Sequence, residues 1–323
     1  MIFKDKTVLI TGGTGSFGKK FTETVLKEFE PKKLIVFSRD ELKQFEMAHK
    51  FIGYEDRIRY FIGDIRDRDR LFRAFHGVDY VVHAAALKQV PAMEYNPTEA
   101  VKTNIIGGMN IIDAAINCGV KKVVALSTDK ACNPISLYGA TKLCSDKLFV
   151  AANAYAGEGG TRFAVVRYGN VVGSRGSVIP FFKNKKGEGV LPVTDPRMTR
   201  FWITLDKGVR FVVRAFERMS GGEIFVPKIP SMNIMDLVKA IAPECKTRVV
   251  GIRPGEKLHE IMISEDDART TIELEDCYVI QPAFKWWNAE AHQGKPVPEG
   301  FSYSSDINDQ WLEVPHLQGM IED

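Results

Sequence analysis

A tyrosine and a lysine one helical turn apart have a spacing that suits acid–base chemistry. Tyr138 and Lys142 stand at positions i and i+4, so on a helix both side chains lie on one face. An ammonium group beside a phenol favours the phenolate and lowers the pKa of the tyrosine. We therefore expect Tyr138 to remove a hydroxyl proton with Lys142 as its activator. A surface or packing pair is the alternative that the spacing alone leaves open.

An acid and an amine stand side by side shortly before that pair. Asp129 and Lys130 follow the apolar run Val123–Ser127, which predicts a buried strand. Adjacent opposite charges usually form a solvated loop pair. Ligands of open α/β sheets, however, bind beyond the carboxyl ends of the strands. We therefore expect both side chains to point at one substrate.

A glycine-rich turn follows the first apolar run, Thr7–Thr11. Gly12, Gly15 and Gly18 have a GxxGxxG spacing and open a helical pattern. Glycine permits a tight turn and lets backbone N–H groups and a helix N-terminus approach a pyrophosphate. The context predicts a dinucleotide site rather than a purely structural turn. The same turn supplies the expected cofactor contacts Thr14, Ser16 and Phe17.

The end of the second apolar run indicates which dinucleotide binds. Ser38 and Arg39 end that run, and Lys43 lies one turn into the next helical pattern. A carboxylate at this place accepts the ribose hydroxyls of NAD, whereas an arginine accommodates the extra phosphate of NADP. We interpret Asp40 as the N-cap of the helix that follows, although it stays among the candidate cofactor contacts. The cofactor is therefore predicted to be NADP.

Residues after the third and fourth runs complete the predicted cofactor site. Asp64 and Ile65 follow the third run, where an adenine can accept and donate hydrogen bonds. Ala84 and Ala85 follow the fourth and leave room for close approach of the cofactor. Lys88 is placed to meet a phosphate or a ribose.

Alternation of apolar runs with amphipathic stretches predicts an α/β fold, a doubly wound parallel Rossmann sheet with a smaller C-terminal substrate-binding domain. After Asn170 the pattern becomes irregular, so we place the boundary between residues 1–172 and 173–323, with segments of the second part able to return to the sheet. The expected strands are Thr7–Thr11, Lys33–Ser38, Arg59–Ile62, Tyr80–His83, Val123–Ser127 and Phe163–Arg167.

Composition limits the class of protein. The 323 residues are 45% hydrophobic and 26% charged, as in ordinary globular proteins, and the net charge of +3 gives no broad basic field for nucleic acid or anionic lipid. The five cysteines are dispersed without metal-ligand spacing, which fits a reducing cytoplasm and predicts no metal. No apolar run approaches the roughly 20 residues of a membrane span. We assign no catalytic role to Cys132 or His83.

Three runs together carry a resemblance to a known family. Ser127–Ala131, Leu137–Lys142 and Arg167–Gly173 resemble the inverting UDP-N-acetylglucosamine 4,6-dehydratases of the extended short-chain dehydrogenase/reductase superfamily. Retaining sugar-nucleotide dehydratases typically carry Asp-Glu where this chain has Asp129-Lys130. The resemblance covers nearly the whole chain and extends over Thr11–Gly18, Phe37–Lys43, Pro196–Thr204, Gly222–Pro230 and Gly251–Glu260.

This resemblance implies a reaction. Tyr138 would assist oxidation at C4 of the sugar, neutral Lys130 would remove the C5 proton, and Asp129 would protonate the departing C6 hydroxyl. Hydride would return to C6, and C5 would be inverted. The product would be a UDP-2-acetamido-2,6-dideoxy-β-L-arabino-hexos-4-ulose for bacterial surface glycan or flagellin sugars of the pseudaminic acid type. We expect burial beneath the substrate to favour neutral Lys130 and protonated Asp129, with the cationic nicotinamide and Lys142 further disfavouring a charged Lys130.

Cationic and amide side chains complete the expected substrate site. Arginine forks match phosphate oxygens, so we place Arg175, Arg200 and Arg253 near the UDP diphosphate. The resemblance also implies a homo-oligomer, a dimer or a hexamer. It implies substrate or nicotinamide contacts at Lys88, Thr103, Asn104, Lys130, Asn170, Thr194, Arg253 and Glu256.

Two other functions fit parts of the pattern. A sugar-nucleotide 4-epimerase or a simple dehydrogenase needs Tyr138 and Lys142 but not the Asp129-Lys130 pair. A non-enzymatic NADP-binding regulator needs the fold alone. Product analysis separates these possibilities, because loss of water changes the mass of the sugar and epimerisation does not.

Overall fold

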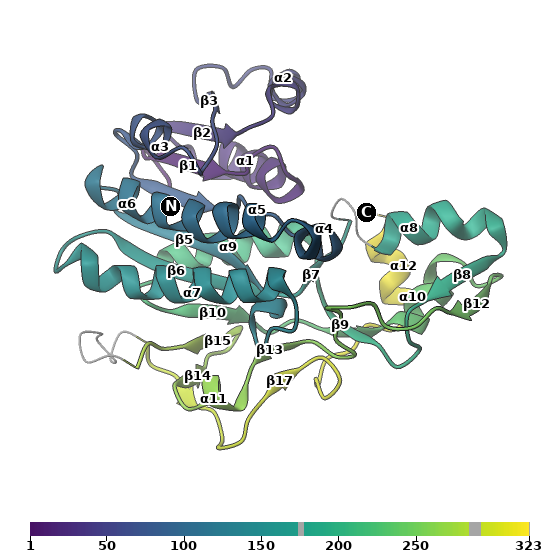
Figure 1. The fold of residues 1–323 in the computed structure, drawn as a ribbon. Coiled ribbons are helices and arrows are strands. Elements are labelled where there is room, and N and C mark those ends of the chain that lie inside the picture. Colours follow the sequence, from purple (N-terminus) through teal and green to yellow (C-terminus); the bar gives the residue numbers. More distant parts are fainter. Residues whose placement is uncertain (174–177, 284–291, 323) are drawn as a thin grey trace.

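Buried runs of β-branched residues form a ten-stranded sheet whose central part is parallel. A computed structural model describes residues 1–173, 178–283 and 292–322 (Figure 1). The sheet order is β16-β14-β15-β10-β6-β5-β4-β1-β2-β3, and the strands from β10 to β3 pair in parallel. These seven strands are β1 (Thr7–Thr11), β2 (Lys33–Ser38), β3 (Ile58–Ile62), β4 (Tyr80–His83), β5 (Lys122–Thr128), β6 (Arg162–Tyr168) and β10 (Ile224–Pro227).

The predicted Rossmann fold class is confirmed. Each of the six expected strands is present within one residue of its predicted bounds at either end. The order 3-2-1-4-5-6 is that of a doubly wound dinucleotide-binding sheet.

Helices cover both faces of the sheet (Figure 1). On one face α3 (Arg68–Phe75) packs against α6 (Gly107–Asn117), and α6 packs against α7 (Leu137–Ala156). On the other face α1 (Ser16–Glu28) packs against α9 (Leu205–Arg218). The remaining helical segments of this half are α2 (Glu41–Lys50), α4 (Val90–Tyr95), α5 (Pro97–Val101), the π-helix η1 (Lys102–Ile106) and the 3₁₀ turn η2 (Asp129–Ala131).

A second, smaller hydrophobic core lies beside the sheet (Figure 1). Phe182, Leu191, Trp202 and Leu237 are among its buried members. Its elements are β7 (Asn170–Val171), α8 (Val178–Lys185), η3 (Lys186–Glu188), β8 (Val190–Val193), β9 (Thr199–Ile203), β11 (Ser231–Asn233), α10 (Ile234–Ile241), β12 (Lys246–Val249) and α12 (Val314–Glu322).

The second half of the chain also returns to the large sheet. β15 (Cys277–Ile280) pairs antiparallel with β10, β14 (Thr271–Glu273) with β15, and β16 (Lys295–Pro296) with β14. β13 (Ile261–Ile263) pairs antiparallel with β17 (Tyr303–Ser304), and β13 lies next to η2. The short helix α11 (Glu265–Ala268) follows β13. The boundary at 172/173 stays a prediction, because the chain crosses between the two cores more than once.

No helix within the described ranges is long and apolar enough to cross a membrane.

Candidate active site

A cavity of about 710 Å³ opens at the carboxyl ends of the parallel strands. The residues that follow β1, β2, β3, β4, β5 and β6 all line it, as expected for a doubly wound sheet. The four predicted catalytic residues and every predicted cofactor contact are among the lining residues: Gly12, Thr14, Gly15, Ser16, Phe17, Gly18, Ser38, Arg39, Asp40, Lys43, Asp64, Ile65, Ala84, Ala85, Lys88, Thr103, Asp129, Lys130, Tyr138 and Lys142.

The glycine turn between β1 and α1 is packed too closely for side chains. Gly12 has a φ of +66°, and a Cβ added there would lie 2.9 Å from the Cα of Ala85. A Cβ on Gly18 would lie 2.3 Å from the carbonyl oxygen of Gly13. No side chain caps the N-terminus of α1. Its first N–H groups therefore suit an anionic group such as a pyrophosphate.

Two cations stand at the end of β2. Asp40 is the N-cap of α2 and accepts a hydrogen bond from the backbone N–H of Lys43 at 3.0 Å, which confirms the N-cap interpretation. The Lys43 ammonium pairs with the same carboxylate and holds the pKa of Asp40 below its ordinary value. Arg39 is more than half exposed, and its guanidinium meets Asp64 only at 3.5 Å. Arg39 is thus the less constrained of the two cations.

His83 at the end of β4 has a structural environment. The Thr11 hydroxyl lies 2.8 Å from its Nδ1 and also accepts hydrogen bonds from the N–H groups of Ala84 and Ala85. Burial, with a contribution from the Lys142 charge, lowers the pKa of His83 to about 3. A neutral His83 therefore ties the end of β1 to the backbone that lines the cavity.

The π-helix η1 separates the roles of two neighbouring residues. Thr103 lines the cavity, and its buried Oγ1 has no hydrogen-bond partner among the described residues. Asn104 does not line the cavity. The side-chain amide of Asn104 forms hydrogen bonds with the backbone N–H and the carbonyl of Leu87 and with the Thr141 hydroxyl, at 2.9 to 3.0 Å. Asn104 therefore holds the loop after β4, contrary to the substrate contact that we expected.

The long helix α7 and the short turn η2 bring the four predicted catalytic residues together. Ser136 caps α7, and from that start Tyr138, Lys142 and Asp146 lie on one helix face. The Tyr138 phenol interacts with Thr128, the last residue of β5. Tertiary packing of α7 against η2 thus places the phenol beside the acid and the amine.

Asp129 and Lys130 form an ion pair rather than a solvated loop pair. Lys130 Nζ lies 3.1 Å from Asp129 Oδ1, which also accepts a hydrogen bond from the Thr128 hydroxyl at 2.8 Å. Asp129 is completely buried, and its other carboxylate oxygen has no partner among the described residues. The same ammonium lies 3.1 Å from Glu260 Oε1.

The neutral state that we expect for Lys130 beneath the substrate stays a prediction, and the carboxylates around the amine oppose it. Burial lowers the pKa of Lys130, but the carboxylates of Asp129 and Glu260 together raise it further, so the net pKa lies above the ordinary value. Lys142, which we expected to disfavour the Lys130 charge, points elsewhere and donates to the Leu126 carbonyl at 2.8 Å.

The pKa of Tyr138 also departs from the prediction. Burial raises it to about 12, and the charge that opposes this rise belongs to Lys130 rather than to Lys142. Lys142 is buried, and desolvation lowers its own pKa. The pKa of the phenol thus lies above its ordinary value, and Lys130 is the cation that lowers it most. Activation of Tyr138 by Lys142 stays a prediction.

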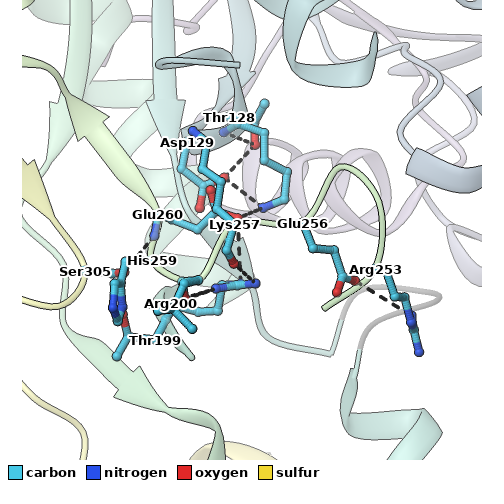
Figure 2. A network of polar contacts seen from close by, with 12 residues as sticks. Thr128, Asp129, Thr199, Arg200, Arg253, Glu256, Lys257, His259, Glu260 and Ser305 are labelled. Atoms are coloured by element: carbon cyan, nitrogen blue, oxygen red, sulfur yellow. Dashed lines mark hydrogen bonds and ion pairs between the residues drawn. The ribbon is translucent and has the colours of Figure 1, made fainter. Parts of the chain in front are cut away.

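Glu260 is the residue that sequence reasoning missed. It lies in the loop before β13, and its side chain is 2% exposed. Figure 2 shows it among Asp129, Arg200 and Ser305, while Arg253 and Glu256 pair to one side. Glu260 falls inside the run Gly251–Glu260 that carries part of the resemblance, but no spacing in the sequence relates it to Lys130.

The expected substrate contacts divide into two groups. Lys88, Asn170, Arg253 and Glu256 line the cavity, and oxygens of Asn170 and Glu256 are buried without a partner among the described residues. Thr194 does not line the cavity, and Arg175 lies outside the described residues.

Arg200 does not line the cavity either. Its guanidinium donates to the carbonyls of Thr199, Leu258 and Lys257 at 2.6 to 3.0 Å. This is contrary to the diphosphate contact that we expected, because its donors hold the loop that carries Glu260.

The described residues contain no group of three or more His, Cys, Asp or Glu that could hold a metal ion. The phenol, the amine and the carboxylate that line this cavity suit acid–base chemistry, and the glycine turn beside them suits a dinucleotide.

Comparison with known proteins agrees with this geometry. Residues 8–282 match the family described as polysaccharide biosynthesis protein. The chain is 58% identical over 330 aligned positions to a UDP-N-acetylglucosamine 4,6-dehydratase (inverting) of Campylobacter jejuni, covering 99% of this chain and 98% of the relative.

Two solved structures show the same fold. Pen from Bacillus thuringiensis superposes with a TM-score of 0.91 at 41% identity, covering 100% of this chain and 99% of that one. DesIV, a dTDP-glucose 4,6-dehydratase from Streptomyces venezuelae with NAD and TYD bound, has a TM-score of 0.69 at 26% identity, with 78% and 86% covered.

Proposed function

The chain belongs to the polysaccharide biosynthesis protein family, and from that premise we propose that it is an inverting UDP-N-acetylglucosamine 4,6-dehydratase. The observation that carries this proposal is the buried pair of Asp129 and Lys130 on the wall of the cavity, next to the phenol of Tyr138. An epimerase or a dehydrogenase has no use for an acid and an amine at this position.

The cofactor is a nicotinamide dinucleotide, which accepts a hydride from the sugar and returns it when bound. Gly12, Gly15 and Gly18 would hold its pyrophosphate, because a Cβ at Gly12 or Gly18 would collide with backbone. The unpartnered Thr103 hydroxyl fits a polar group of the same ligand.

Arg39 and Lys43 support NADP as the particular cofactor. Both cations line the cavity at the end of β2, and an arginine at this place in a Rossmann sheet can accommodate the extra phosphate of NADP. Asp40, the carboxylate that could instead accept ribose hydroxyls, is already used as the cap of α2 and by the Lys43 ammonium.

Tyr138, Lys130 and Asp129 each move a proton in the proposed reaction. Tyr138 takes the proton of the C4 hydroxyl as a phenolate, so its phenol, whose pKa burial raises to about 12, must first lose its own proton. Once C4 is a ketone the C5 hydrogen is acidic, and the Lys130 amine removes it from one face of the ring. Asp129 protonates the C6 oxygen as water leaves. Because the carboxylates of Asp129 and Glu260 raise the pKa of Lys130, this side chain must lose a proton before it can act as a base. The second Asp129 oxygen, which has no partner among the described residues, is a proton acceptor at hand.

One experiment tests both the reaction and its stereochemistry. The purified protein is incubated with UDP-N-acetylglucosamine in heavy water, and NMR follows loss of water, deuterium at C5 and the ring configuration. We expect a 6-deoxy-4-keto sugar with C5 labelled and inverted. A sugar isomer of unchanged mass would contradict the proposal and indicate an epimerase. The Lys130→Ala variant should lose C5 exchange, and exchange at the parent rate would refute the assignment of the base.

The setting of the enzyme follows from the same family. We propose that its product enters bacterial surface glycan or flagellin sugar biosynthesis of the pseudaminic acid type, on the strength of the resemblance to dehydratases of that kind. All five cysteines are free, which supports a reducing cytoplasm. The support for a homo-oligomer, a dimer or a hexamer, is the family resemblance alone.

A further inference from the structure

Glu260 is a buried carboxylate behind the predicted base, and no part of the mechanism above uses it. It does not line the cavity, and its Oε1 lies 3.1 Å from Lys130 Nζ. Its other oxygen, Oε2, has no partner among the described residues. A buried carboxylate with one unsatisfied oxygen is costly, so a fold that keeps one beside an active-site amine calls for a physical reason.

The backbone holds Glu260 rigidly in this place. Its N–H donates to the Ser305 hydroxyl at 2.9 Å, and the N–H of Ser305 donates to its carbonyl at 2.8 Å. The Ser305 hydroxyl also lies 2.7 Å from that of Thr199, at the start of β9 (Figure 2). The segments that contain Thr199, Glu260 and Ser305 are far apart in the sequence, and their hydrogen bonds together hold the backbone of Glu260 in place.

The charges around Lys130 balance only when Glu260 is counted. Lys130 faces the carboxylates of Asp129 and Glu260, and Arg200 lies behind them with its Nε 3.7 Å from Glu260 Oε1. Tyr138 and Lys88 also face Lys130 from α7 and from the loop after β4. The two cations and two carboxylates that are joined by ion pairs, Lys130 and Arg200 with Asp129 and Glu260, form a neutral cluster, and Lys88 is a further cation outside those ion pairs. Without Glu260 the cluster would carry one excess positive charge.

Resting on the proposed function, we infer that Glu260 is a positioning residue for Lys130. It holds the amine toward the cavity and stabilises the ammonium that forms when the C5 proton is taken. In that step the C5–H bond breaks and an N–H bond forms on Lys130, and the electron pair left on C5 is delocalised into the C4 ketone. Glu260 remains an anion throughout. Asp129, which lines the cavity, is left free to serve the C6 oxygen.

The direction of the effect follows from the electrostatics. The Glu260 carboxylate raises the pKa of Lys130, whereas Arg200 lowers it. Neutralising Glu260 therefore makes Lys130 a weaker base with a lower pKa. Each unit of pKa is a factor of about ten in proton affinity, so at high pH, where Lys130 is already neutral in both proteins, we expect Glu260→Gln to reduce the rate of C5 proton removal by up to about tenfold per unit. At lower pH the larger neutral fraction of Lys130 in the variant offsets this loss. The KM should change little, because Glu260 does not line the cavity.

The test is the pH profile of C5 deuterium exchange with UDP-N-acetylglucosamine, measured for the parent protein, Glu260→Gln and Glu260→Asp. The limb of the profile that depends on Lys130 should move to lower pH by one unit or more in Glu260→Gln. It should move less in Glu260→Asp, which keeps the charge and carries the test if Glu260→Gln does not fold. The exposed carboxylate Glu265 supplies the matched control, Glu265→Gln, with the parent profile expected.

Two kinds of failure are distinguishable. If the parent protein forms no dehydrated product, the proposed function fails. If the parent is active and both Glu260 variants keep the parent limb, the inference alone is overturned. A lower rate with an unmoved limb would make Glu260 merely structural, which also overturns it.

Discussion

Replacement of Arg167 by methionine should destabilise the protein strongly, because Arg167 is the only cation shown to pair with the buried Asp146 among the described residues. Arg167 lies on β6 and is 1% exposed. Its guanidinium lies 3.3 Å from Asp146 on α7 and 3.1 Å from Asp267 on α11, and it donates to the Met262 carbonyl at 2.9 Å. The side chain thus connects the parallel sheet to the segments that return from the second half of the chain.

The size of the effect follows from burial. Methionine keeps most of the volume but removes the charge, and the Asp146 side chain, 2% exposed, then has no adjacent guanidinium. Burial already raises the pKa of Asp146 with Arg167 present. Removing one partner of a buried pair costs about 3–5 kcal/mol, whereas replacing both partners is often close to neutral. We therefore expect Arg167→Met to lose about 3–5 kcal/mol and Arg167→Met/Asp146→Asn to recover much of that loss.

Thermal unfolding followed by circular dichroism measures this, with a fall in Tm of about 4–7 °C for Arg167→Met. The matched control is Arg197→Met, since Arg197 pairs with Asp195 at 2.8 Å but is 73% exposed. A surface pair contributes at most about 1 kcal/mol, so the control should unfold close to the parent. Equal losses for both variants, or no recovery in the double variant, would refute the reasoning.

Three further predictions concern the cavity. Gly18→Ala places a Cβ 2.3 Å from the Gly13 carbonyl, so it should cost about 1–3 kcal/mol and abolish dinucleotide binding. Cofactor titration and Tm check this against Gly108→Ala, where the added Cβ has only ordinary contacts from 3.6 Å. Arg39→Ala should weaken NADP binding roughly tenfold or more and leave NAD binding unchanged in calorimetry, and an equal loss for both would contradict the assignment. Because the pKa of His83 is lowered to about 3, the unfolded chain takes up a proton below about pH 6.5 and the folded chain does not. Stability should therefore fall by about 2 kcal/mol between pH 7.5 and 5.0, and His83→Gln should remove that part of the fall in denaturant titrations at the two pH values, whereas an unchanged fall would disprove it.

The local pattern of the sequence determined the sheet and the cofactor site. Buried parallel strands read as short apolar runs with polar ends, and these runs located six strands within one residue at each end. The residues just after those runs share one edge of the sheet whatever the loops do. This is why the predicted cofactor contacts that follow a strand directly, such as Gly12, Arg39 and Ala84, line one cavity, whereas Tyr138 and Lys142 reach it through the packing of α7.

Tertiary structure alone decided the protonation states and the polar partners. Lys130 and Glu260 lie far apart in the sequence, and Ser305 and Thr199 bring Glu260 to the amine from two other segments. A pKa depends on every charge within a few ångströms, so the sequence around Lys130 did not reveal that a second carboxylate raises the pKa of this amine.

The same reason applies to the amide and guanidinium groups. Asn104 and Arg200 have the right chemistry for a ligand, but the folded chain offers them backbone carbonyls within hydrogen-bond distance. Buried donors bind the acceptors that packing supplies. The sequence by itself therefore determined which residues reach the cavity edge of the sheet. Only tertiary packing decided that polar groups such as Asn104 and Arg200 hydrogen-bond to the protein around the cavity instead of lining it.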